Sequence, residues 1–325
     1  MTAMTTMYEA ARVAFLALDP VHVGSGGYRL GRVDLTIARE PGTNLPKIPG
    51  TSLAGAARSY AAMRYGKPEA AGQHKKFSGD RDTCPIVFTF GTATDTGGGQ
   101  AGTVSFGDAH ILFFPVASMR GPVWVTTSGI LRAADFTVKG EPPPDRETIC
   151  TSLPVAAGET LNLRWLLFAS VSSGIVVSAP APLEFFAEVS NRIVLVHPDL
   201  FEQVVSSNLE VRTSVSIDPV TGAAEDGALF SYEAIPRATW LVQDVIQDNY
   251  RGGFEPVRSQ FRRPRNGEPG AERLGDPLGE EWNRPLDVAF SGLRAMEYLG
   301  VGGMGTRGFG RMKLVGSWAA NREAK

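Results

Sequence analysis

The sequence predicts an α+β fold of ferredoxin-like type that carries large insertions. Segments with β-rich alternation lie near both ends of the chain, and two apolar-periodic segments that are far apart in the sequence indicate helices. The order is strand, turn, strand, helix, further strands, then helix, loop and strand, which corresponds to a βαββαβ plan. The same plan underlies the commonest RNA-binding module, in which the sheet or its loops contact RNA.

The N-terminal part supplies two predicted strands and the first predicted helix. Val13–Leu18 and Val33–Ile37 are both β-rich and alternate in polarity, and a glycine-rich turn separates them. Thr51 or Ser52 is placed to cap a helix that runs from Leu53 to Tyr65. Further predicted strands are Val104–Phe106, Ile111–Phe114, Val123–Thr126 and Leu161–Ala169.

The C-terminal part combines a hairpin with the last helix and strand. Extended segments on both sides of Asp218–Gly222 predict a long β-hairpin over residues 209–236. The last helix has an apolar face from Leu286 to Met296 and Gly300 as its stop, and a final strand follows at Arg311–Val315. Two more predicted helices are Leu183–Asn191 and Pro198–Val205.

We interpret residues 8–318 as a single domain with two large surface insertions. Residues 67–102 contain polar, glycine-rich stretches, and residues 251–285 are rich in proline, glycine and arginine. Such composition is typical of long surface segments rather than of core elements.

Composition narrows the function classes. No apolar run is long enough to span a membrane and the N-terminal residues lack a secretory signal, so a cytoplasmic location is expected. Cys84 and Cys150 are too few for a disulfide framework and are not spaced as paired metal ligands. The net charge of −2 argues against nucleic-acid binding by the whole surface. Leu45–Asp82 and Arg251–Arg273 are nevertheless locally basic, which permits a basic groove.

The glycine-rich segment after the last predicted helix is the most informative stretch. Gly303, Gly305 and Gly308 spell G-x-G-x-x-G, but a dinucleotide fingerprint requires a strand before it and a helix after it. Here the order is helix, loop, strand, so we reject a dinucleotide site. Glycines let the backbone adopt positive φ and approach a ligand closely, and consecutive N–H groups can form an anion nest.

The charge that complements an anion at this loop must come from side chains. The loop follows the C-terminus of a helix, where the macrodipole opposes an anion. Arg307, Arg311 and Lys313 are the available cations. A tight structural turn is the alternative, but it needs one or two glycines, so we favour phosphate contact.

Two further places could bind an anion. His22-Val-Gly-Ser-Gly forms a second glycine loop, with Gly24, Ser25 and Gly26. Thr51 and Ser52 lie at a helix N-terminus, whose free N–H groups suit a phosphate. We expect Arg58, further along that helix, to reach the same anion.

In their succession these motifs resemble the RAMP superfamily of CRISPR proteins, and within it the backbone subunit of type III effector complexes. Ile111–Gly121 resembles the Cmr-series (type III-B) version rather than the Csm-series (type III-A) version. One departure is Ala54, where the family often has a lysine. The matching pieces are His22–Gly26, Gly31–Asp34, Arg39–Glu40, Leu45–Leu53, Phe90–Gly91, Gly102–Ala109, Thr221–Gly222, Glu233–Pro236 and the terminal glycine loop.

The resemblance implies a hand-shaped, RRM-like RAMP fold whose copies stack head to tail into an open helical filament. A projecting thumb hairpin would interrupt the guide–target duplex at regular intervals, and residues 209–236 are the candidate thumb. The implied partners are guide RNA, target RNA, copies of this chain and other CRISPR effector subunits. The residues assigned to RNA binding are His22, Gly24, Ser25, Gly26, Arg39, Thr51, Ser52, Arg58, Gly303, Gly305, Arg307, Gly308 and Arg311.

Asp34 matches the aspartate that cleaves target RNA in this family. RNA breaks when a 2′-hydroxyl attacks the adjacent phosphorus in line, so an enzyme must hold that geometry and assist proton or charge movement. Nearby basic loops are expected to lower the pKa of Asp34, which makes it a weak base. We therefore expect Asp34 to hold a divalent metal, Mg²⁺ or Mn²⁺, or to position the hydroxyl.

Three alternatives stay open. In the first, the chain is a structural backbone subunit that does not cleave RNA. In the second, it is a guide-processing endoribonuclease of the same superfamily that uses His22. In the third, it is a small-molecule enzyme that uses the glycine loops. Substitution of Asp34 distinguishes the first, and substitution of His22 the second. No Ser-His-Asp or histidine-rich metal constellation favours the third.

Overall fold

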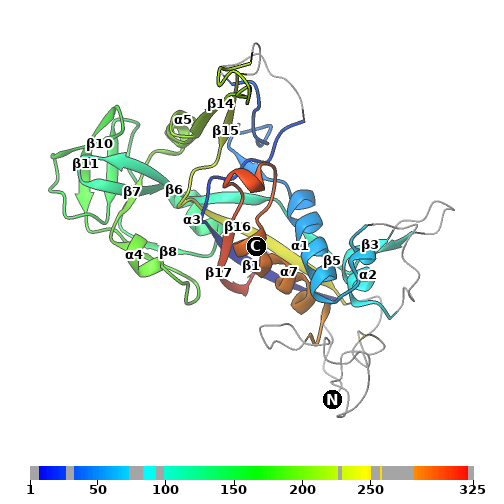
Figure 1. The fold of residues 1–325 in the computed structure, drawn as a ribbon. Coiled ribbons are helices and arrows are strands. Elements are labelled where there is room, and N and C mark those ends of the chain that lie inside the picture. Colours follow the sequence, from blue (N-terminus) through cyan, green and yellow to red (C-terminus); the bar gives the residue numbers. More distant parts are fainter. Residues whose placement is uncertain are drawn as a thin grey trace, which may run out of the picture.

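The computed structural model describes residues 7–26, 33–72, 83–92, 99–225, 229–249, 257 and 282–320. These residues form one 11-stranded mixed sheet with helices packed against it and three small two-stranded sheets (Figure 1). The α+β class predicted from the sequence is confirmed. The path of the large sheet is β10 (Thr160–Leu163), β11 (Leu166–Ser173), β9 (Thr148–Thr151), β13 (Ile193–Leu195), β7 (Gly121–Thr126), β6 (Ala109–Ser118), β16 (Trp240–Asp248), β1 (Tyr8–Ala17) and β17 (Met312–Ala319). Two short strands complete the sheet off this path: β2 (Lys47–Ile48) pairs with β6, and β5 (Val104–Phe106) pairs with β16.

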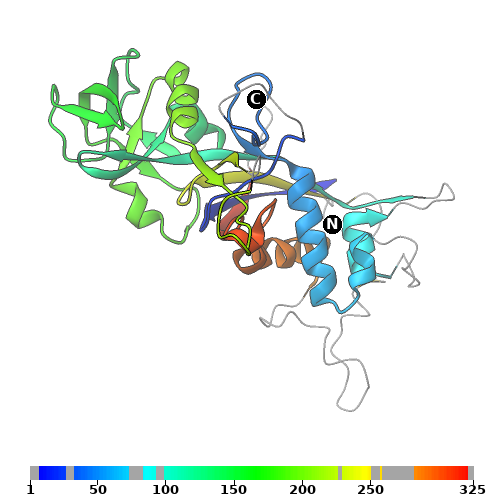
Figure 2. The ribbon, with the colours of Figure 1, turned by 45° about the horizontal axis from the view of Figure 1, so that its top comes forward.

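Four antiparallel strands and two helices make the part of the fold that carries the glycine loops. The strands lie in the order β6, β16, β1, β17, and all three pairings are antiparallel. α1 (Gly50–Arg64) and α7 (Pro285–Leu299) pack together next to this sheet (Figures 1 and 2). A Cβ on Gly292 would lie 2.1 Å from the carbonyl oxygen of Ala57, so the two helices approach closely only because that position is glycine.

The remaining strands extend the sheet through β6. Its first half pairs with β16 and its second half, from Phe114 to Ser118, pairs with β7. This extension carries α3 (Ser128–Ala133), α4 (Phe186–Ser190) and α5 (Pro198–Ser207), and it occupies the green, left-hand part of Figure 1. The smaller elements are β2 (Lys47–Ile48), η1 (Pro68–Ala71), α2 (Pro85–Phe90), β3 (Gly91–Thr92), β4 (Gln100–Ala101), β5 (Val104–Phe106), β8 (Thr137–Lys139), β12 (Val176–Ser178) and η3 (Gly305–Arg307).

The predicted hairpin around Asp218–Gly222 is present as a separate antiparallel ribbon. β14 (Glu210–Ser214) pairs with β15 (Phe230–Ala234) and with no strand of the large sheet among the described residues. In Figure 1 this ribbon stands at the upper edge, beside α5 and the blue segment that follows the first glycine loop.

Several predicted elements differ in the structure. Val33–Ile37 is not a strand: it makes two isolated bridges, because the N–H groups of Asp34 and Leu35 both donate to the Ser231 carbonyl. Leu161–Ala169 is two strands, β10 and β11, since the chain reverses at Arg164 with φ of 60°.

Two helices also differ from their predicted bounds, and some predicted segments remain untested. Leu183–Asn191 contains only the five-residue α4. α1 begins at Gly50 with Pro49 as its N-cap and no side-chain cap, so the predicted cap at Thr51 or Ser52 is wrong. Most of the 251–285 segment, and parts of 67–102, lie outside the described residues. Within the described ranges, no helix has both the length and the apolar character needed to cross a membrane.

Candidate nucleic-acid interface

The two glycine loops form one unit. The N–H of Gly303 donates to the carbonyl of His22 and the N–H of Gly310 donates to the carbonyl of Pro20, each at 2.9 Å. Gly302 has a φ of 84°, and a Cβ there would lie 2.4 Å from the His22 carbonyl oxygen. The sequence predicted both loops, and the structure brings them together.

The tip of the terminal loop is exposed. Apart from partly buried Met304, Gly302 to Gly308 are all open to solvent. Gly305 has ordinary φ and no atom within 4 Å of an added Cβ, so neither packing nor backbone strain requires a glycine at that position. A glycine that the protein itself does not require is consistent with the close approach of a ligand.

A hollow of about 410 Å³ separates this loop from α1. Ser52, Gly55 and Ser59 line it from the helix, and Gly302 and Gly305 line it from the loop. Two segments that the sequence predicted independently therefore face the same space, which is the candidate groove for a polynucleotide backbone.

The N-terminus of α1 already holds an anion of the protein. The N–H of Gly50 donates to Oδ1 of Asp108 at 2.8 Å, and Lys47 pairs with the other carboxylate oxygen at 2.7 Å. Thr51 remains exposed beside it. Arg58 does not reach this end: its Nε donates to the Ala70 carbonyl in η1 at 2.9 Å. Burial lowers the pKa of Arg58.

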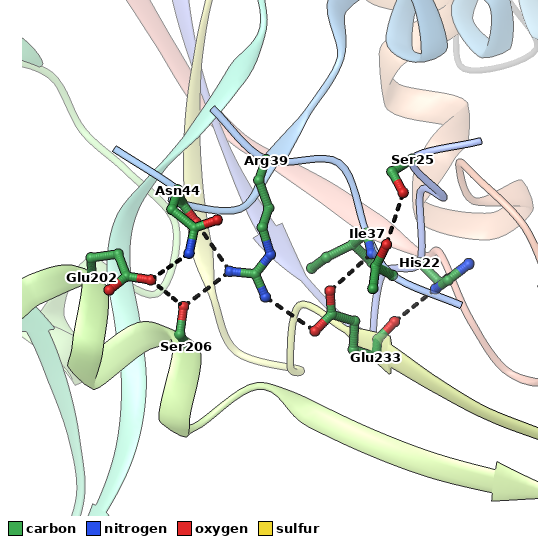
Figure 3. Close-up of polar contacts among 9 residues, drawn as sticks. His22, Ser25, Ile37, Arg39, Asn44, Glu202, Ser206 and Glu233 are labelled. Atoms are coloured by element: carbon green, nitrogen blue, oxygen red, sulfur yellow. Dashed lines mark hydrogen bonds and ion pairs between the residues drawn. The ribbon is translucent and has the colours of Figure 1, made fainter. Parts of the chain in front are cut away.

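Arg39 and Glu233 form the centre of a buried polar network (Figure 3). Arg39 donates to Oε2 of Glu233 at 3.1 Å, to the carbonyl of Asn44 at 3.0 Å and to Oγ of Ser206 at 2.9 Å. The side chains of Arg39 and Glu233 are only 13% and 10% exposed. The guanidinium is therefore occupied by the protein, and it ties β15 to α5.

The same network fixes the first glycine loop. The ring Nδ1 of His22 lies 2.7 Å from the carbonyl oxygen of Glu233, and because a carbonyl only accepts, Nδ1 carries the proton. His22 is 6% exposed and makes an edge contact with Tyr232. Ser25 joins the loop to Thr36 through a hydroxyl pair at 2.8 Å. His22 and Ser25 thus also serve the structure of the loop.

Asp34 is exposed and lies beside β15 near the end of the β14–β15 pair that leads into the hairpin loop. Its Oδ2 accepts from the N–H of Ser231 at 2.7 Å and from the Ser231 hydroxyl at 2.9 Å. These bonds lower the pKa of Asp34, first through the backbone N–H and then through the hydroxyl. The direction of the shift agrees with the sequence expectation, but its cause is hydrogen bonding rather than nearby positive charge.

The residues around Asp34 do not make a metal cage. The described part of the chain contains no group of three or more histidine, cysteine, aspartate or glutamate side chains that could hold an ion. Asp34 offers one carboxylate, and one of its two oxygens already accepts two hydrogen bonds. The donor set therefore does not fit a site formed by protein alone.

Arginines and aromatic rings alternate where the terminal loop meets the ribbon. Arg212 lies over the Phe309 ring at 4.6 Å and Arg307 over the Phe230 ring at 5.9 Å. Arg311 instead pairs with both carboxylate oxygens of Asp19. Arginine planes and aromatic faces are the groups on which single-stranded bases stack.

Comparison with known proteins identifies the family. A model of the RAMP superfamily matches residues 15–313. The chain belongs to the RAMP superfamily. The CRISPR system Cmr endoribonuclease Cmr4 of Pyrococcus furiosus is 31% identical over 255 residues, which are 73% of this chain and 81% of that protein. The CRISPR system Cms endoribonuclease Csm3 of Enterococcus italicus is 31% identical over 118 residues, 35% of this chain and 51% of that protein.

Solved structures share the RAMP fold of this chain. A chain in the structure of the Type III-B Cmr-beta bound to cognate target RNA has a TM-score of 0.62 at 17% identity, covering 94% of this chain and 96% of that one. Oligomeric Cmr4 from Pyrococcus furiosus has a TM-score of 0.57 at 20% identity, covering 97% and 99%. The resemblance to the Cmr series inferred from the motifs is confirmed.

The RAMP fold gathers part of the predicted site and separates another part. The terminal loop bonds to His22, and a Cβ on Gly24 would lie 3.5 Å from the His22 ring. Ser52 faces the terminal loop across the hollow. Arg39 and Arg58 are turned to protein partners instead. Sequence reasoning missed Phe230, Ser231 and Arg212, whose only signal was their place in the predicted hairpin, close to Glu233–Pro236.

Proposed function

We propose that this chain is a repeated backbone subunit of a type III-B CRISPR ribonucleoprotein complex that binds guide RNA and cleaves complementary target RNA. The observation that carries the proposal is the junction at β15. An exposed, ionised Asp34 bonds to Ser231, while the neighbouring Phe230 and Tyr232 contact Arg307 and His22 of the two glycine loops. The similarity to the endoribonuclease Cmr4 supports RNA as the substrate.

RNA binding in this proposal uses the hollow between α1 and the terminal loop. Its glycines and small side chains leave room for a sugar-phosphate backbone, and Arg307, two residues after Gly305 in the same loop, supplies positive charge. The alternation of arginine and phenylalanine beside it suits bases that have left a duplex.

Cleavage in this proposal uses Asp34 to position a nucleotide. The carboxylate is ionised at neutral pH, and the bonds from Ser231 lower its pKa and make it a weaker base. It therefore acts chiefly as a hydrogen-bond acceptor for the attacking 2′-hydroxyl. Among the described residues no cluster of side chains could hold Mg²⁺ or Mn²⁺, so Asp34 acts in this proposal through its own carboxylate oxygens.

The assembly part of the proposal concerns the ribbon. Residues 209–236 serve as the thumb, and copies of the chain stack head to tail with other effector subunits in the cytoplasm. The ribbon is separate from the large sheet, and Val211, Ile217 and Val220 on it are exposed. The strand order β6, β16, β1, β17 supports a ferredoxin-like core for this subunit.

The test is Asp34→Asn in the assembled complex. Removing the charge should slow single-turnover cleavage by about 10²- to 10⁴-fold, with target affinity within about twofold of wild type. Asp145→Asn is the matched control, because Asp145 is also exposed and bonded to a nearby hydroxyl and N–H, but lies before β9 in the sheet extension. If the Asp34→Asn complex cleaves at the wild-type rate, Asp34 is not catalytic and the chain is a purely structural backbone subunit.

A second measurement tests the RNA class. Discrete repeat-derived RNAs should copurify with the complex. Processing of precursor RNA by the isolated chain, abolished by His22→Ala, would instead indicate a guide-processing endoribonuclease.

A further inference from the structure

Asp34 and Ser231 are joined by four reciprocal hydrogen bonds, although they lie 197 positions apart in the sequence. The N–H of Asp34 donates to the carbonyl of Ser231 at 3.1 Å and to its hydroxyl at 3.2 Å. In return, the N–H and the hydroxyl of Ser231 both donate to Oδ2 of Asp34.

These bonds fix a side chain that would otherwise rotate freely. Asp34 is exposed and does not belong to a regular strand, so packing restrains its side chain little. Two donors on the same oxygen hold the carboxylate in one orientation. Among the described residues no donor binds Oδ1, which leaves that oxygen for a ligand.

The partner residue lies on the ribbon rather than on the large sheet. Ser231 is the second residue of β15, directly after Phe230, whose ring contacts Arg307. Whatever places the ribbon against RNA therefore also places the carboxylate.

We propose that Ser231 is a positioning residue for RNA cleavage: it ties Asp34 to β15, so that the seating of the ribbon on RNA sets the position of the catalytic oxygen. This inference rests on the proposed function of Asp34. Ser231 touches no reacting atom in this scheme and acts through Asp34.

Three variants of the assembled complex test the proposal. Ser231→Ala deletes the hydroxyl but keeps the backbone bonds, and Ser231→Thr restores a hydroxyl on a residue that suits a strand. Ser214→Ala is the matched control, because Ser214 lies on β14 of the same ribbon and its hydroxyl contacts Tyr232 rather than Asp34. Single-turnover rates at saturating complex and the apparent Kd for target RNA are measured separately.

Ser231→Ala should lower the single-turnover rate by about 10- to 100-fold, because small misplacement of a reacting group carries a cost of that order. The Kd should stay within about twofold, Ser231→Thr should recover most of the rate, and Ser214→Ala should match wild type. A Ser231→Ala complex that cleaves normally, or that loses only affinity, would overturn the proposal. So would a Ser231→Thr complex as slow as Ser231→Ala.

Asp34→Asn is measured in parallel, because it distinguishes a failure of the Ser231 proposal from a failure of the proposed function of Asp34. If Asp34→Asn abolishes cleavage and Ser231→Ala does not change it, Asp34 keeps its role and Ser231 loses its own. If Asp34→Asn cleaves normally, both assignments fall.

Discussion

Arg39→Ala should damage the stability of the protein rather than its affinity for RNA. The substitution removes three hydrogen bonds and leaves Glu233 buried with only the N–H of Ile37 on its carboxylate. Removing one partner of a buried ion pair costs about 3–5 kcal/mol, and because both side chains retain some exposure we expect about 3 kcal/mol. For a chain of 325 residues, with an unfolding entropy of about 2 cal/mol/K per residue, that corresponds to a fall in Tm of about 4–5 °C.

The assay compares thermal unfolding of the purified chain with its RNA affinity. Arg307→Ala is the control, because Arg307 is exposed on the terminal loop and its removal should leave Tm unchanged while RNA binding weakens. In Arg39→Ala/Glu233→Gln, the second change should recover about 1–3 kcal/mol, since the two residues interact directly. An Arg39→Ala chain that melts within about 1 °C of wild type, yet binds RNA at least about tenfold more weakly, would refute the reasoning.

Three other predictions concern Asp108, Gly292 and Arg307. Burial alone would raise the pKa of Asp108, but bonds from Lys47 and Gly50 lower it. Asp108→Ala should therefore cost about 1 kcal/mol of unfolding free energy above about pH 5, and less as acid protonates the wild-type carboxylate, in urea titrations at several pH values. Gly292→Ala should destabilise the α1–α7 contact by about 1–3 kcal/mol, because its Cβ would overlap the Ala57 carbonyl; an unchanged Tm would contradict this packing. Arg307→Ala should reduce the slope of log K against log salt by about one unit, and an unchanged slope would show that it makes no phosphate contact.

The elements with strong local patterns were predictable. α7 has an apolar face and a glycine stop, β1 has clear alternation, and the ribbon has a turn sequence at Asp218–Gly222. Each appears where the sequence indicated, although β1 begins at Tyr8 rather than at Val13. β16 was missed, although it is the strand between β6 and β1.

The reason for missing β16 lies in its sequence. Leu241–Val242 and Val245–Ile246 are apolar pairs, and polar pairs alternate with them, which hides the two-residue period of a strand. The buried face holds Gln243 and Gln247, whose amides bond to the Gly107 carbonyl and the Leu286 N–H. Tertiary hydrogen bonds thus pair the Nε2 of Gln243 and the Oε1 of Gln247, although the Oε1 of Gln243 is buried without a partner among the described residues. In the sequence, the two glutamines argue against a core strand.

The site was predictable in its parts but not in its geometry. Glycine spacing marked both loops, and family motifs marked Asp34. Nothing local shows that Asp34 meets Ser231, or that Arg39 is buried against Glu233, because these contacts depend on how distant segments pack. Similarly, the anion at the start of α1 is the carboxylate of Asp108, the residue directly before β6.

The most direct test of the account is a structure of the assembled complex bound to target RNA with a 2′-deoxy substitution at the scissile nucleotide. The account predicts that the Asp34 carboxylate faces the sugar and phosphate at that linkage, and that Gly302 to Gly308 contact an RNA backbone. A particle in which this loop touches only protein, with Asp34 remote from every cleaved linkage, would contradict it.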